Sequence, residues 1–404
     1  MKSKILELVL LLIAKPLSFV LRVDNKKIIF GAMYGAYYGD NSMHLYEWIL
    51  KNRKDLNPIW ITKNPALYRQ LRKENKPVAS AKRLEGILHL LTANIGVFSN
   101  SLNDLAWSYK IVPESISLIA LRHGRSVKKI RFARENHKLS KKERKEREFE
   151  SKRLRYAIST SEFISDLQEQ CLQIGRKKHI VTGYPRNDEL FNPRTTSEKR
   201  WSSFLGNLKP NKVILYGPSW RHKRYPTKFF PFEDFNSAQL KVFLEKNNYL
   251  LLLRPHRNEL AKYTELVEIL SELSESSEMI KLCTHDIFPD VNIVLPFTDV
   301  LVSDYSALYH DFLLLDRPML FIPYDYDDFE KQSGFLYDYF KYLPGPNVES
   351  FEMFCEELEN ISDDVDTYEN KRETLRNKIH SFQDANSCER VTKLIDRIIT
   401  NETE

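Results

Sequence analysis

Residues 249–257 read YLLLLRPHR, so a short apolar run is followed at once by charged and polar residues. An unbroken apolar run of this length is typical of a strand buried on both faces of a parallel sheet. Ligands of such sheets bind at the carboxyl ends of the strands. Arg254 and His256 therefore lie where a ligand is expected, and Pro255 fixes the turn between them.

The same pattern recurs along the chain, with longer amphipathic stretches between the apolar runs that suit crossover helices. Two successive sets predict an α/β protein with two Rossmann-type domains facing a central cleft. We expect an apolar segment at 1–23, an N-terminal domain at 24–195 and a C-terminal domain with C-terminal helices at 196–404. The predicted strands are Lys27–Phe30, Pro58–Thr62, Ile95–Ser99, Ile116–Leu121, Ala157–Thr160, Ile180–Thr182, Val213–Tyr216, Tyr249–Leu253, Val291–Leu295, Val300–Val302 and Met319–Ile322.

The composition is that of an ordinary folded protein, with 404 residues, 42% of them hydrophobic and 29% charged. Four scattered cysteines without a CxxC pair offer no zinc site and fit a reducing cytoplasm. The net charge of +6 permits an anionic substrate or membrane surface without requiring nucleic acid. Because no carboxylate pair has metal-ligand spacing, we expect neither a metal nor a cofactor.

Two segments suggest contact with a membrane. Residues 5–23 are strongly apolar but are interrupted by Glu7, Lys15 and Pro16, and lysines and arginines flank them. We expect a helix lying on the anionic cytoplasmic surface; the alternatives are a helix packed on the protein's own core and a true span. Residues 132–155 are dense in charge, which predicts either a solvated helix with i,i+4 ion pairs or a basic surface for a membrane or polyanionic acceptor.

Polar turns follow five of the predicted strands, which favours a shared cleft for a charged ligand. Ser303 or Asp304 is expected to cap a helix running to Leu315, so that the amides near Ser306 and Ala307 face an anion. Asp311 on that helix could reach ligand hydroxyls. The five turns are Arg122–Lys129, Gly183–Asp188, Gly217–Arg221, Arg254–Arg257 and Ser303–Ser306.

His123 follows a strand of the first domain, where a neutral imidazole could take a proton from an acceptor hydroxyl. The alternative is a structural or phosphate-binding histidine. The other histidines outside these turns are expected to pack or to lie at the surface. They are His44, His89, His137, His179, His222, His285, His310 and His380.

Taken together, these motifs resemble the CDP-glycerol glycerophosphotransferase family, the teichoic-acid primases and polymerases. The similarity runs from about Ile28 to Pro346. It also includes Tyr38–Ser42, Thr298–Ser306, Asp311–Pro318, Gly334-Phe335 and Pro344–Pro346. The resemblance implies a GT-B-like fold and a transferase of teichoic-acid or capsule biosynthesis. Such an enzyme would move a polyol phosphate, first of all glycerol phosphate, from a CDP-activated donor to a hydroxyl of a lipid-linked or cell-surface polymer and release CMP. It would lie peripherally on the cytoplasmic membrane face.

The resemblance also implies a set of donor-binding residues. His123 is expected to be the base, while His256, Arg186, Arg254 and the helix near Asp304 stabilise the leaving group. Four positions depart from the family pattern: Arg125-Ser126 replaces Thr-Pro, Ala307 replaces a serine, and Ser333 replaces an arginine. The full predicted set is His123, Gly124, Arg125, Ser126, Val127, Arg186, Ser219, Trp220, Arg254, Pro255, His256, Asp304, Ser306, Ala307 and Asp311.

Two other functions fit the same pattern. One is a GT-B glycosyltransferase that uses a nucleotide sugar for cell-surface polysaccharide synthesis. The other is a catalytically silent membrane-bound binding protein, against which the presence of both His123 and His256 argues. The donor separates the enzyme alternatives: CDP-glycerol or CDP-ribitol against UDP-sugars.

Overall fold

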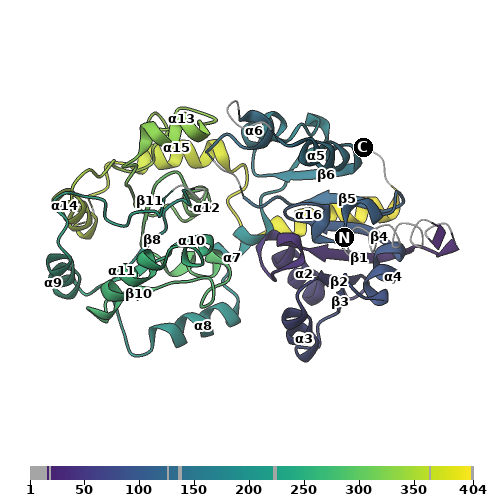
Figure 1. The fold of residues 1–404 in the computed structure, drawn as a ribbon, viewed down its shortest axis with the longest axis horizontal. Coiled ribbons are helices and arrows are strands. Elements are labelled where there is room, and N and C mark those ends of the chain that lie inside the picture. Colours follow the sequence, from purple (N-terminus) through teal and green to yellow (C-terminus); the bar gives the residue numbers. More distant parts are fainter. Residues whose placement is uncertain are drawn as a thin grey trace. The chain divides into compact units, whose positions relative to one another are not determined.

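The computed structural model describes residues 16–17, 20–124, 127–134, 139–221, 225–363 and 365–401. The chain divides into two compact units. Unit 1 holds residues 1–124, 131–188 and 381–404, and unit 2 holds residues 125–130 and 189–380. Each unit is built around one parallel β-sheet (Figure 1).

Unit 1 contains a seven-stranded sheet of order β3-β2-β1-β4-β5-β6-β7, and every neighbouring pair is parallel. The strand order reverses between β1 and β4. These two strands pair with one another, and Ile28 of β1 lies opposite Ile95 of β4. Such a reversal opens a crevice at the carboxyl ends of the strands. The strands are β1 Asp24–Gly31, β2 Asn57–Thr62, β3 Val78–Ser80, β4 Ala93–Phe98, β5 Ser117–Ala120, β6 Leu154–Ser159 and β7 His179–Val181.

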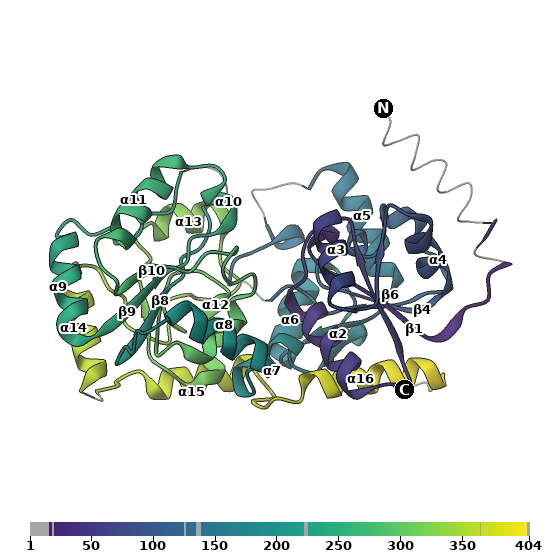
Figure 2. The same cartoon turned by 90° about the horizontal axis from the view of Figure 1, so that it is seen from below.

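Helices of unit 1 bury apolar faces against this sheet. Tyr46 and Ile49 of α2 and Leu71 of α3 join the strands in one core. Val391 and Ile395 of the C-terminal helix α16 belong to the same core, and Figure 2 shows α16 close to α2. The helices are α2 Asp40–Asn52, α3 Pro65–Lys73, α4 Leu84–Thr92, α5 Lys141–Arg153, α6 Glu162–Leu172 and α16 Ser387–Thr400.

Unit 2 contains a five-stranded parallel sheet of order β10-β9-β8-β11-β12, and its order reverses between β8 and β11. Tyr216 at the end of β8 lies opposite both Leu253 of β9 and Val302 of β11. The strands are β8 Lys212–Tyr216, β9 Tyr249–Leu253, β10 Ile280–Leu282, β11 Val300–Ser303 and β12 Met319–Phe321. The helices are α8 Thr195–Leu205, α9 Ser237–Asn247, α10 Arg257–Leu260, α11 Thr264–Glu275, α12 Leu308–Phe312, α13 Tyr326–Ser333, α14 Phe351–Ser362 and α15 Glu369–Ile379, with α7 Asp188–Phe191 at the junction of the units.

The predicted α/β class with two parallel sheets is confirmed, and ten of the eleven predicted strands are present with small shifts of their ends. That the two domains face a central cleft stays a prediction. The predicted strand Val291–Leu295 is wrong: this apolar run forms 3-10 turns, because the Asp290 side chain accepts a hydrogen bond from Asn292 N and Pro296 follows. The edge strands β3 and β10, of three residues each, were not predicted.

The division into units differs from the expected boundary between 195 and 196. Residues 381–404 belong to unit 1, because α16 packs into its core and the Asp188 carboxylate accepts hydrogen bonds from the backbone N–H groups of Ser387 and Cys388. Residues 125–130 belong to unit 2, where Lys129 N donates to Gly334 O at 3.0 Å.

The two segments expected to contact a membrane are described to different extents. Most of the segment 1–23 lies outside the described residues, so the expected interfacial helix stays a prediction. Within the described ranges, no helix is both long and apolar enough to span a bilayer. Part of the charged stretch, Lys141–Arg153, forms α5, which begins with a capping box of Ser140 and Glu143 and carries an Arg144–Glu148 ion pair. This is the geometry expected of a solvated helix.

Candidate functional site

A histidine–aspartate pair lies at the carboxyl ends of the unit 1 strands. His123 follows β5, and Asp40 opens α2 with a left-handed φ of 62°. His123 Nδ1 is hydrogen-bonded to Asp40 Oδ2. The His123 side chain is 52% exposed, whereas that of Asp40 is 4% exposed. A buried carboxylate thus orients an imidazole whose other face is open to solvent.

The Asp40 carboxylate is held by further donors. Arg186 Nη1 donates to Asp40 Oδ1 at 3.1 Å, and Asn41 N donates to the same oxygen at 2.8 Å. Burial alone raises the pKa of the Asp40 carboxyl, but His123 and Arg186 outweigh burial, so this pKa lies below its usual value of 3.8. Asp40 is therefore ionised at neutral pH.

Asn41 connects the three segments that carry this pair. Its Nδ2 donates to Arg122 O at 2.9 Å, next to His123, and its Oδ1 accepts from Arg186 N at 3.1 Å. Gly124 has a φ of 74°, and a Cβ there would collide with the Arg186 guanidinium. The structure therefore brings together three predicted site residues: His123, Gly124 and Arg186.

The remaining predicted residues of this turn lie elsewhere. Arg125 and Ser126 are outside the described residues. Val127 belongs to unit 2, where its side chain is fully buried and its carbonyl accepts a hydrogen bond from Leu336 N at 2.8 Å. The Val127 side chain is therefore part of the unit 2 core.

In unit 2, an ion-pair network fixes the loop that follows β8. Asp304 Oδ1 accepts from Ser219 N at 2.8 Å, and Asp304 Oδ2 pairs with Arg221 Nη1 at 2.5 Å. Arg221 also pairs with Asp325 through Nε at 2.8 Å. Both Arg221 and Asp304 have 1% exposed side chains. Asp304 thus holds the Ser219-Trp220 loop at the reversal between β8 and β11.

The loop after β9 places His256 against Trp220. The two rings are stacked, with centroids 5.1 Å apart and planes 3° apart. His256 Nδ1 accepts a hydrogen bond from Asn258 N at 3.2 Å, which assigns the ring proton to Nε2. Nε2–H is then the donor that His256 can offer to a ligand.

Arg254 is buried and donates from Nη1 to Cys283 O at 2.9 Å and from Nη2 to Phe288 O at 3.0 Å. These bonds hold the loop after β10, and Pro255 is buried between Arg254 and His256. The ring of His285 in the same loop lies 6.4 Å from that of His256. Burial, with Arg254 and His256 nearby, lowers the pKa of His285 to about 4.

The prediction that Ser303 or Asp304 caps a helix is wrong. Ser303 Oγ donates to Gly217 O at 2.9 Å, and Asp304 is engaged by Ser219 and Arg221. The helix α12 begins only at Leu308, follows Ala307, and has five residues before the 3-10 turn Leu313–Leu315. Ser306 Oγ accepts from Leu308 N at 3.3 Å, and Asp311 is buried on α12.

Three titratable residues of unit 2 were not among the predicted site residues. Arg221 stood in a quoted motif, but a lone arginine gives no sign of the two carboxylates it pairs with. Asp325 follows β12 in a loop that was not considered, and His285 follows the strand β10 that was not predicted. Asp325 and His285 could have been predicted from their position shortly after short apolar runs.

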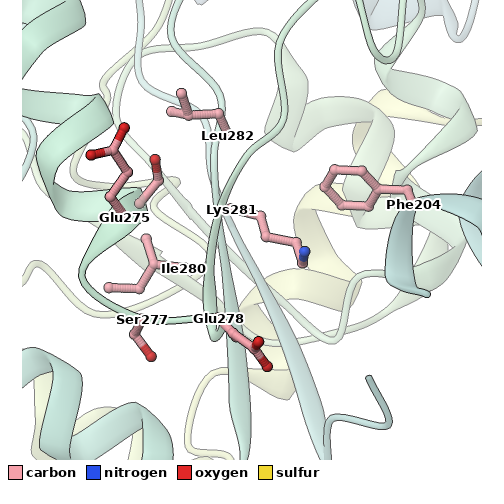
Figure 3. A pocket seen from close by; sticks show the side chains of 8 residues that line it. Phe204, Glu275, Ser277, Glu278, Ile280, Lys281 and Leu282 are labelled. Carbon is pink, nitrogen blue, oxygen red and sulfur yellow. The ribbon is translucent and has the colours of Figure 1, made fainter. Parts of the chain in front are cut away.

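A shallow hollow of about 390 Å³ lies at the edge strand β10 of unit 2 (Figure 3). It is lined by Ser274, Ser277, Leu282 and five other side chains, and Lys281 Nζ lies 5.7 Å from the ring centroid of Phe204. None of its lining residues belongs to the predicted site. Within the described part of the chain, no group of three or more His, Cys, Asp or Glu residues is placed to hold a metal ion.

Comparisons with known proteins agree with this geometry. Residues 13–397 match the family CDP-Glycerol:Poly(glycerophosphate) glycerophosphotransferase. The chain is 27% identical to the teichoic acid glycerol-phosphate transferase of Staphylococcus aureus over 93% of this chain and 94% of that protein. It is 28% identical to the teichoic acid poly(glycerol phosphate) polymerase of Bacillus spizizenii, over 89% and 91%. The solved structure of the wall teichoic acid polymerase TagF superposes with a TM-score of 0.78 at 22% identity, covering 98% of this chain and 93% of that one.

The two parallel sheets and the superposition on TagF define a GT-B-like fold. The chain belongs to the CDP-glycerol:poly(glycerophosphate) glycerophosphotransferase family. The predicted family, fold and reaction are thereby confirmed: the protein is an enzyme that transfers glycerol phosphate from CDP-glycerol to a polymeric acceptor. The family match selects this function over the sugar-transferring and catalytically silent alternatives.

Proposed function

We propose that the His123–Asp40 pair is the general base of this glycerol phosphate transfer. The observation that carries the proposal is the hydrogen bond from the half-exposed His123 ring to the buried, ionised Asp40. Since Nδ1 faces the carboxylate, Nε2 is the nitrogen that can accept a proton from an acceptor hydroxyl. Asp40 stabilises the imidazolium that results.

The proposed step balances without a further reactant. The acceptor hydroxyl oxygen attacks the phosphorus of CDP-glycerol that carries glycerol, and a new P–O bond forms. The bond from that phosphorus to the oxygen shared with CMP breaks, and CMP leaves with the electron pair. The acceptor proton passes to His123 Nε2.

Unit 2 is the proposed donor side. His256 offers Nε2–H beside the stacked Trp220, so it can donate to a diphosphate oxygen of CDP-glycerol. The anchored Ser219 loop and the buried Arg254 lie at neighbouring strand ends of the same sheet. The other predicted donor residues are proposed parts of the donor site, and Asp304 acts there through the Ser219-Trp220 loop that it anchors. They are Gly124, Arg125, Ser126, Val127, Arg186, Pro255, Asp304, Ser306, Ala307 and Asp311.

The test compares His123→Ala with His256→Ala. His123→Ala should lower turnover ~10²–10⁴-fold and leave the Kd of CDP-glycerol within about twofold, because binding the donor does not need the base. His256→Ala should weaken donor binding as well as turnover. His89→Ala, at a half-buried position on α4 outside the site, is the matched control. CMP release and calorimetric titration separate the two roles, and a proportional loss of donor affinity in His123→Ala would make His123 a phosphate ligand instead.

We propose that the enzyme prefers CDP-glycerol over CDP-ribitol, because the relatives that align along 84–94% of the chain are glycerol-phosphate enzymes. CDP-ribitol is the comparison donor, since ribitol-phosphate polymerases also align over about half of the chain. Turnover with CDP-ribitol equal to that with CDP-glycerol would overturn this choice.

We also propose peripheral attachment to the cytoplasmic face of the membrane through residues 1–23 and the basic residues around them. The support is the sequence pattern: an apolar run flanked by lysines and arginines. Deletion of residues 1–22 should move the protein from vesicles containing phosphatidylglycerol into the supernatant without changing its melting temperature. Loss of the cooperative melt would instead identify this segment as part of the core.

A further inference from the structure

Three arginines contact the loops that follow β1, β4 and β5 at the carboxyl ends of the unit 1 strands, beside the order reversal between β1 and β4. We call Arg122, Arg131 and Arg147 the arginine cluster. Arg131 Nη2 donates to Asn100 O in the loop after β4, and Arg147 interacts with Tyr34 in the loop after β1. In open α/β sheets, the crevice at such a reversal is where ligands bind.

One carboxylate, that of Glu150, faces the arginine cluster directly. Arg122 Nη1 lies 3.7 Å from Glu150 Oε1, and Arg147 Nη1 lies 3.3 Å from Oε2. The Glu150 side chain is 4% exposed. Among the described residues, Glu150 therefore pairs with two of the three guanidinium groups, and the charge of Glu146 also acts on Arg147.

The charges of the neighbouring arginines affect the pKa of Arg131. Burial and then the charges of Arg122 and Arg147 lower the pKa of Arg131 to about 9, and Glu150 and Tyr34 oppose this shift only in part. Like charges held together at low exposure raise the free energy of the folded protein unless an anion joins them.

The two other carboxylates of this neighbourhood have different partners. Asp104 accepts backbone hydrogen bonds from Tyr34 at 2.6 Å and Asn100 at 2.7 Å, and burial raises its pKa to about 6. Glu146 accepts from Asn103 Nδ2 at 2.6 Å. Neither carboxylate forms an ion pair with the arginine cluster within the described residues.

Arg131 has donors to spare. Its hydrogen bond to Asn100 O is long, at 3.5 Å, whereas a guanidinium carries five N–H donors in a planar fork that suits phosphate. Arg122 and Arg131 both have left-handed backbones, with φ of 63° and 51°. Such conformations are typical of functional sites. Arg122 also directly precedes His123 in the chain.

We propose that the arginine cluster binds a phosphodiester group of the acceptor and so holds the acceptor hydroxyl near His123. This inference rests on the proposed role of His123 as the base. The acceptor is a chain of glycerol phosphate units, so each unit next to the attacking hydroxyl brings one negative charge for the arginines. A purely structural role would be to join α5 to the sheet, which the pair between Arg122, just after β5, and Glu150 of α5 does in part.

The test uses a synthetic glycerol phosphate tetramer as the probe, with full-length protein at low salt. Arg131→Gln should weaken tetramer binding at least ~10-fold in calorimetric titration, the effect of losing one charge-assisted phosphate contact. The Kd of CDP-glycerol should stay within about twofold. Arg131→Lys keeps the charge but loses the fork, so it should recover part of the affinity. Arg144→Gln, on the exposed face of α5, is the matched control and should change neither value.

Each other outcome overturns the proposal in a distinguishable way. Equal loss of CDP-glycerol and tetramer affinity would assign the arginine cluster to the donor. Loss of binding to phosphatidylglycerol vesicles with unchanged tetramer binding would make the ligand a lipid headgroup. Unchanged tetramer binding in Arg131→Gln, or no tetramer binding by the unaltered protein, would leave a structural role alone. A failure of His123 as base would appear separately, as CMP release that survives His123→Ala.

Discussion

Replacing Asp40 by Asn tests the catalytic pair most directly. Asp40 has a φ of 62°, a conformation that Asn tolerates, so the backbone should not be strained by this change. The variant loses the negative charge that faces His123 Nδ1 and Arg186 Nη1. A hydrogen bond to a charged group contributes ~1.5–3 kcal/mol, which corresponds to ~10–150-fold in turnover.

A second effect adds to the loss of charge. An Asn side chain that turns its N–H toward His123 Nδ1 would place the ring proton on Nε2 and remove the lone pair that accepts the acceptor proton. We therefore expect turnover to fall ~10²–10⁴-fold in total. Folding should also lose ~1.5–3 kcal/mol, because buried Arg186 loses its charged partner.

The assay is CMP release at saturating CDP-glycerol, with donor binding measured by calorimetry below the melting temperature of the variant. Asp55→Asn is the matched control, since Asp55 is 50% exposed and pairs with Arg53 away from the site. Its turnover should be unchanged. More than a tenth of normal turnover in Asp40→Asn would refute the argument, and so would a parallel loss of donor affinity.

Two further predictions concern unit 2. Arg221→Met leaves the buried carboxylates of Asp304 and Asp325 without their cation. The free energy of unfolding, measured in urea, should therefore fall by ~3–5 kcal/mol. A fall below ~1 kcal/mol would mean that the network is not stabilising. The pKa of His285 is about 4 when folded and about 6.5 when unfolded, so the unfolded state binds more protons between these values. Stability is then complete above pH 6.5 and falls as the pH drops toward 4, by no more than ~3 kcal/mol because partial exposure screens the effect. His285→Gln should flatten this part of the stability curve, and an unchanged slope would show that His285 titrates normally.

The strands were predictable where burial on both faces made them continuously apolar. Tyr249–Leu253 has the bounds read from the sequence. Val291–Leu295 is equally apolar but turns instead, because the hydrogen bond from Asn292 N to the Asp290 side chain and the following proline favour a 3-10 turn. Apolarity predicts burial, whereas the local hydrogen bonds decide which buried conformation forms.

The candidate site was predictable where a residue acts at the end of its own strand. His123, Gly124 and Arg186 were predicted and do lie together. The role of Asp304 as an anchor was not predictable, because its partners Ser219 and Arg221 are more than 80 residues away. The residues next to Asp304 in the sequence predict that it caps a helix. In the structure, its carboxylate instead pairs with the distant Arg221.

Each unit contains a buried aspartate that is held in the same way, but the two aspartates have different effects. In each, a buried carboxylate is held by an arginine and a backbone N–H: Asp40 by Arg186 and Asn41 N, Asp304 by Arg221 and Ser219 N. The difference lies in the group that faces Oδ2 of each carboxylate. Asp40 turns its second oxygen toward a half-exposed histidine, so its fixed charge can act on a group that reaches solvent.

Asp304 Oδ2 pairs with Arg221, whose side chain is 1% exposed, so the charge of Asp304 is neutralised inside the protein. Its effect is to fix the backbone of the Ser219-Trp220 loop on which His256 stacks. Because a charge with a fixed orientation costs no reorganisation when a reaction begins, the first arrangement suits catalysis. Because a fixed loop loses no further freedom when a ligand arrives, the second arrangement suits binding.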